Sequence, residues 1–103
     1  MFDLINNKIL ISGGITMVLA MPNTKPAIVN AEALEKTEKL YEQKALCDYG
    51  LYLGAGIDNA EAISQVAYRS CGLKMYLNTT FGDLKLDNME SWIKRKIKRH
   101  IRK

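Results

Sequence analysis

Residues 72–82 read Gly-Leu-Lys-Met-Tyr-Leu-Asn-Thr-Thr-Phe-Gly, and the interpretation of the chain starts from this stretch. Gly72 to Leu77 are almost all apolar and predict a short buried strand. Asn78 to Phe81 predict a loop rich in hydroxyl and amide groups. Lys74 stands out within the strand, because lysine is mostly exposed in folded proteins. It is either an ordinary strand lysine that reaches solvent or a catalytic or modified lysine at the end of a parallel strand, and this stretch alone leaves both interpretations open.

Two further strand patterns precede this stretch. Ile15 to Met21 is a near-continuous apolar run between Gly14 and Pro22, which is typical of a strand buried on both faces in a parallel sheet. Tyr49 to Gly54 is the second pattern, and it ends in glycine. Both are therefore predicted to be strands.

Helical patterns lie between the predicted strands. Asn30 to Leu46 is the clearest, with Asn30 as N-cap and an apolar face that consists of Leu34, Thr37, Tyr41 and Ala45. Ala60 to Ser70 is the next, capped by Asp58 or Asn59, with an apolar face of Ile63, Val66 and Ala67. A last helix is predicted to begin at Asp87 or Asn88 and to run through the tail.

The first residues have a weaker pattern. Asp3 to Ser12 fits a helix that Gly13-Gly14 would end as a C-cap. A strand at Lys8 to Ile11 fits nearly as well, so both interpretations stay open here.

The alternation of strands and helices predicts an α/β fold with three adjacent parallel strands. Helices on one side would leave one sheet face bare and two edges unpaired, as in an arc of a (β/α)₈ TIM barrel, which needs about 250 residues. Chemistry in such barrels lies at the carboxyl ends of the strands. Those ends hold Pro22 to Thr24, Gly54 to Gly56, and Lys74 with the loop after it.

Composition is that of a soluble globular chain of 103 residues, with 48% hydrophobic and 25% charged residues. No run of 18 apolar residues is present. Cys47 and Cys71 have no partner motif and are interpreted as reduced thiols of a cytoplasmic protein.

Positive charge is concentrated in residues 93–103, which hold seven of the fifteen Lys and Arg and no acid. Met89, Ile93, Ile97 and Ile101 form an apolar stripe there. A basic amphipathic helix can bind an acidic membrane or nucleic acid. We interpret it instead as a solvated face, because charge runs are usually solvated and no aromatic residue follows Trp92 to stack on bases.

Two motifs carry a resemblance to a known family. Gly13 to Val18 with Ala20 to Thr24, and Gly72 to Asn78 with Thr80-Phe81, resemble segments of the dihydroorotases of the amidohydrolase superfamily. The resemblance is strongest to the dihydroorotase domain of animal multifunctional proteins of pyrimidine synthesis. It covers residues 13–92.

The resemblance implies a binuclear zinc site in a barrel that interconverts carbamoyl aspartate and dihydroorotate, in a homo-oligomer. Lys74 would be the lysine that takes up carbon dioxide, giving a carbamate that bridges the metals. The reaction needs a neutral amine, which burial favours. Asn23 would bind the substrate carboxylate. Thr80 would hydrogen-bond the substrate on a closing loop, and Phe81 would help to exclude water.

The sequence also departs from the family. Its one histidine, His100, lies in the tail and matches no family ligand, so Lys74 is the only candidate metal ligand, whereas zinc needs three or four. Residues 1–12 and 93–103 do not resemble the family. We therefore expect a truncated fragment that is inactive alone. The alternatives are another cyclic-amidohydrolase relative or a non-catalytic homologue, and a small binding module that uses its basic tail.

Overall fold

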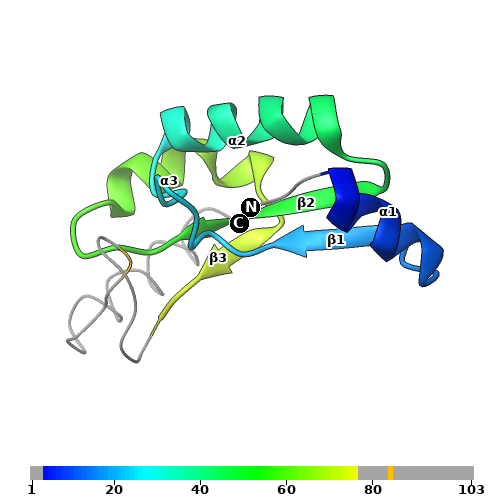
Figure 1. Cartoon of the computed structure of the whole chain (residues 1–103). Helices are drawn as coiled ribbons and strands as arrows, with labels where there is room; N and C mark the ends of the chain where they lie inside the picture. Colours follow the sequence, from blue (N-terminus) through cyan, green and yellow to red (C-terminus); the bar gives the residue numbers. More distant parts are fainter. Residues whose placement is uncertain (1–3, 77–83, 85–103) are drawn as a thin grey trace.

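The computed structural model describes residues 4–76 and residue 84 (Figure 1). Its three strands are β1 (Met17–Ala20), β2 (Asp48–Gly54) and β3 (Gly72–Lys74). They form one parallel sheet in the order β1-β2-β3, with Val18 opposite Tyr49 and Leu53 opposite Leu73. The predicted α/β fold with three adjacent parallel strands is confirmed. The loop Asn78 to Phe81, the last helix and the basic tail lie outside the described residues.

Two helices cover one side of this sheet, α2 (Ala31–Lys44) and α3 (Ala60–Val66), the latter followed by a short 3₁₀ helix, η1 (Ala67–Arg69) (Figure 1). Asn30 caps α2 as predicted, because its side-chain oxygen accepts from the amide of Ala33 at 2.9 Å. The core lies between sheet and helices, and its buried residues are Ile28, Leu34, Tyr41, Leu51, Leu53, Ile63 and Val66.

The first segment is a helix, α1 (Leu4–Ser12), so the alternative strand at Lys8 to Ile11 is wrong. The predicted glycine cap is present: Gly14 has φ +88°, and its amide and that of Ile15 bond to the carbonyls of Ile11 and Leu10. This pair of bonds is the Schellman motif that ends many helices.

Helix α1 is fixed to the rest of the fold through Asn7. Its side chain is fully buried and accepts a hydrogen bond at 3.2 Å from the amide of Leu46, between α2 and β2. Helix α1 therefore lies at the end of the sheet where the strands begin (Figure 1).

The other face of the sheet, which we call the bare face, has no helix over it within residues 4–76, although the buried side chain of Leu84 lies over Gly54 at the carboxyl end of β2. On β1 and beside it, Ile15, Met17, Leu19 and Met21 are 42%, 55%, 46% and 41% exposed. The prediction that this strand is buried on both faces is therefore wrong for the described residues, because none of the helices within residues 4–76 covers this side of β1. An unbroken apolar run such as Ile15 to Met21 fits a strand that is buried on both faces in a closed barrel. The three strands described here do not close a barrel, so one face of β1 is exposed.

Large side chains on this bare face lean over glycines of the next strand. A Cβ built on Gly50 would lie 2.8 Å from a methyl of Leu19, and one built on Gly72 would lie 2.9 Å from the ring of Tyr52. Leu19 thus occupies the space above β2, and Tyr52 the space above β3.

Some boundaries differ from the prediction. Helix α3 ends at Val66, where the chain tightens into η1, so Ala67 is exposed although it was predicted on the apolar face. Strands β1 and β3 are also shorter than the apolar runs that predicted them. A strand ends where its backbone pairing with the next strand ends, and the apolar run continues beyond that point. No helix within the described part of the chain is long and apolar enough to cross a membrane.

Candidate functional site

The carboxyl ends of the three strands form one edge of the sheet, which we call the rim: residues 21–30 after β1, 54–59 at the end of β2, and 74–76 at the end of β3. Backbone hydrogen bonds join its parts. The amide of Ala55 donates to the carbonyl of Lys74 at 2.9 Å, and that of Gly54 donates to the carbonyl of Ile28 at 2.8 Å. The predicted gathering of these segments at one edge is confirmed.

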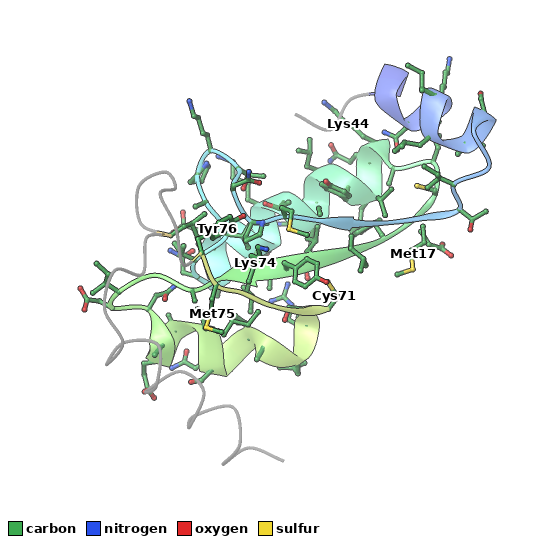
Figure 2. The ribbon with its side chains drawn as sticks, turned by 90° about the horizontal axis from the view of Figure 1, so that it is seen from below. Met17, Lys44, Cys71, Lys74, Met75 and Tyr76 are labelled. Atoms are coloured by element: carbon green, nitrogen blue, oxygen red, sulfur yellow. The ribbon has the colours of Figure 1, made fainter. Side chains whose placement is uncertain are left out.

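Lys74 is the last residue of β3 and lies on the bare face of the sheet. Its neighbour Leu73 packs against the core, and successive strand residues point to opposite faces. Lys74 is half-buried, and its Nζ lies 5.4 Å from the centre of the Tyr76 ring, within the range of a cation–π contact (Figure 2). In a closed (β/α)₈ barrel this face lines the interior, and the role of Lys74 there stays a prediction.

Tyr76 is a rim residue that the sequence did not single out. Its hydroxyl oxygen is buried and has no hydrogen-bond partner among residues 4–76 and 84. Burial raises the pKa of the Tyr76 phenol above its ordinary value. The sequence could have identified it, because residues two positions apart in an extended chain point to the same side, and Tyr76 follows Lys74 by two.

Asn23 lies on the same rim, on the loop between β1 and α2. It is exposed, whereas Pro22 before it is buried. The hydroxyl of Thr24 donates to the carbonyl of Pro26 at 2.8 Å and closes a turn within this loop. The structure thus places Asn23 and Lys74 at one edge of the sheet. The roles assigned to them stay predictions, and Thr80 and Phe81 lie outside the described residues.

Asn59 was predicted as a possible helix cap, but its side chain is used differently. It makes no capping hydrogen bond to α3. Its Nδ2 donates to the carbonyls of Val29 and Gly54, at 2.8 and 2.9 Å, and its Oδ1 accepts from the amide of Gly56 at 2.8 Å. Asn59 therefore connects two segments of the rim.

The described residues do not make a metal site by themselves. Within residues 4–76 and 84, no group of three His, Cys, Asp or Glu side chains is placed to hold a metal ion. Both cysteines are free, and burial raises the pKa of the Cys71 thiol. His100 lies outside the described residues. Of the metal ligands that the resemblance implies, this part of the chain contains Lys74 alone, and its role as a ligand stays a prediction.

Comparison with known proteins identifies relatives, although no family model matches the chain. It is 47% identical over 83 residues to the multifunctional protein CAD of Squalus acanthias, and 43% identical over 83 residues to the multifunctional protein pyr1-3 of Dictyostelium discoideum. These matches cover 81% and 80% of this chain. A dihydroorotase of Pyrococcus furiosus is 45% identical over 56 residues, 53% of the chain. The chain is homologous to the dihydroorotases.

The chain spans only a small part of these relatives: 4% of each multifunctional protein and 14% of the Pyrococcus furiosus dihydroorotase. The match to the multifunctional proteins falls in their dihydroorotase region. The homology to dihydroorotases predicted from residues 13–24 and 72–81 is confirmed.

Solved structures confirm the barrel fold. An L-hydantoinase (dihydropyrimidinase) from Arthrobacter aurescens superposes with a TM-score of 0.84 at 23% identity, over 92% of this chain and 21% of that one. The inactive dihydroorotase-like domain of a Chaetomium thermophilum CAD-like multifunctional protein gives 0.76 at 22% identity, over 91% of this chain and 28% of that one. The chain therefore has the fold of part of a (β/α)₈ barrel, with three parallel strands.

Proposed function

We propose that the chain is a piece of a zinc-dependent dihydroorotase domain, which interconverts carbamoyl aspartate and dihydroorotate in pyrimidine synthesis in the cytoplasm. The observation that carries the proposal is the position of Lys74, on the bare face at the carboxyl end of β3, in a chain 47% identical to a multifunctional protein CAD. Residues 13–92 would be the barrel part, with residues 1–12 and 93–103 outside the family pattern.

Lys74 would act as a carboxylated lysine in the complete domain. The lone pair of its neutral amine would attack the carbon of carbon dioxide, forming an N–C bond while one C=O π pair moves onto oxygen, and the nitrogen would then release one proton to water. The resulting carbamate offers a metal two oxygen donors, whereas the protonated form of the amine has no lone pair to offer. Zinc, when bound, would acidify the water that attacks the cyclic amide. The place of Lys74 at the carboxyl end of β3, on the face away from the helices, supports this role.

The other residues would bind substrate. The exposed amide of Asn23 would donate to the substrate carboxylate from the rim loop. Thr80 would donate a hydrogen bond to the substrate, and Phe81 would keep water out.

The chain alone would not turn over substrate. One lysine cannot replace the three or four protein ligands that a zinc ion takes. We therefore expect no interconversion of carbamoyl aspartate and dihydroorotate by the purified chain, with or without zinc and bicarbonate.

The test is to graft residues 13–92 into a complete dihydroorotase barrel in place of the matching segment, and to measure zinc stoichiometry and turnover. Lys74→Ala should lower both together, and a short carboxylic acid in the medium should partly restore them. Lys74→Arg should not restore them, since guanidinium stays protonated. Lys36→Ala, on the exposed face of α2, is the matched control and should be silent. Full zinc and full turnover in Lys74→Arg would refute the assignment.

A further inference from the structure

Asn59 makes more connections between rim segments than helix capping requires. It is the residue before α3, yet its backbone angles of φ −101° and ψ 14° lie outside the extended region that N-caps adopt. Asn30 provides the comparison within the same chain. It is extended, at φ −152° and ψ 176°, and its side chain does cap α2. The side chain of Asn59 is therefore committed to the rim.

The three hydrogen bonds of Asn59 require a primary amide. Two acceptors, the carbonyls of Val29 and Gly54, face its nitrogen, and one donor, the amide of Gly56, faces its oxygen. An amide side chain offers two N–H donors and one carbonyl acceptor in one plane. A carboxylate has no donor, and a hydroxyl has only one. The site is thus specific for asparagine chemistry.

These bonds fix the loop that carries Asn23. Next to Val29, the amide of Ile28 donates to the carbonyl of Pro22 at 3.1 Å, and the carbonyl of Ile28 accepts from Gly54 at 2.8 Å. Ile28 is fully buried. The loop between Pro22 and Val29 is therefore closed on itself and attached to the end of β2 at two adjacent points, one of which is the side chain of Asn59.

We propose that Asn59 is a positioning residue of the rim, which sets the place of the Pro22–Val29 loop, and with it Asn23, relative to the end of β2. That this placement serves substrate binding rests on the function proposed above. The hydrogen-bonded connection itself does not rest on it, because it follows from the contacts of residues 22–59.

The experiment is residue-resolved amide hydrogen exchange on the full chain. Asn59→Ala removes all three bonds, so exchange at Gly56, Gly54 and Ile28 should rise by about tenfold, the factor that corresponds to one lost hydrogen bond. The amide of Leu34, in α2, should change by less than about twofold, because α2 lies outside this network.

Asn59→Asp separates the two halves of the connection. The carboxylate can still accept from Gly56, so that amide should keep its protection, whereas Gly54 and Ile28 should lose theirs as in Asn59→Ala. Asn30→Ala is the matched control, an asparagine that does cap a helix. It should accelerate exchange at Ala33 and leave Gly56 unchanged.

Unchanged exchange at the rim in Asn59→Ala would overturn the proposal, as would loss of protection only in the first turn of α3, which is the mark of an ordinary cap. Should Asn59→Ala unfold the chain, Asn59→Asp decides, and equal loss at Gly56 and Ile28 in that variant would also overturn it. The role of Lys74 and the proposed function are tested separately, by the zinc content and turnover of the grafted barrel. The positioning role of Asn59 can therefore fail while the proposed function stands, and the reverse.

Discussion

The bare face of the sheet predicts that two leucines on neighbouring strands differ sharply in their contribution to stability. Leu53 on β2 is fully buried in the core between sheet and helices, whereas Leu19 on β1 is 46% exposed on the other face. Leu53→Ala should lower the free energy of unfolding by about 3 to 4 kcal/mol, from lost transfer free energy and the cavity left behind. Leu19→Ala should cost about 1 kcal/mol, since only about half of its side chain is removed from water.

The assay is urea unfolding of each variant followed by circular dichroism, at a concentration where the chain is monomeric. The two variants should differ by about 2 to 3 kcal/mol in unfolding free energy with similar m-values, or by roughly 10 to 20 °C in midpoint temperature for a chain of this size. Equal losses would refute the reasoning. They would mean that Leu19 is as well covered as Leu53, and hence that the face of the sheet away from the helices is not bare.

Two further predictions concern association and pH. Because the bare face and the strand edges are open, we expect the chain to associate with itself. The double variant Met17→Lys, Leu19→Lys should associate less in sedimentation velocity. If its sedimentation coefficient depends on protein concentration as that of the parent does, this face is not the contact. Burial raises the pKa of Tyr41 above its ordinary value of 10.0, so the stability that its neutral phenol contributes is complete below pH 10 and is lost as the pH rises through the pKa of the folded state. Tyr41→Phe should therefore unfold less steeply with alkali in a pH titration of circular dichroism, and a profile identical to the parent would contradict this.

The sequence predicted the strands and helices because each is a local pattern. Asn30 before an amphipathic run and Gly13-Gly14 after α1 act within four or five residues, and both caps are present as expected. The apolar runs that became β1 and β3 were recognised for the same reason. The parallel order followed from the helix between each pair of strands.

Interactions between distant residues were not predictable in this way. Asn59 bonds to Val29, thirty residues away, and Asn7 bonds to Leu46, thirty-nine residues away. The local pattern around Asn59 favours a helix cap. Nothing near Asn59 in the sequence indicates that its side chain bonds instead to the distant carbonyl of Val29. For the candidate site, the sequence located the rim and Lys74, and the structure was needed for the hydrogen bonds that support them.

The glycines of the sheet determine how much room its bare face leaves. Leu19 lies over Gly50 and Tyr52 over Gly72, so each large side chain is tilted along the sheet instead of standing upright from it. In a closed barrel such tilting would make the lining thinner on this side and the chamber above β2 and β3 deeper. A methyl group added at Gly72 would push the Tyr52 ring upright and reduce the volume of that chamber near Lys74. Gly50 and Gly72 thus leave the space that Leu19 and Tyr52 occupy above the neighbouring strands.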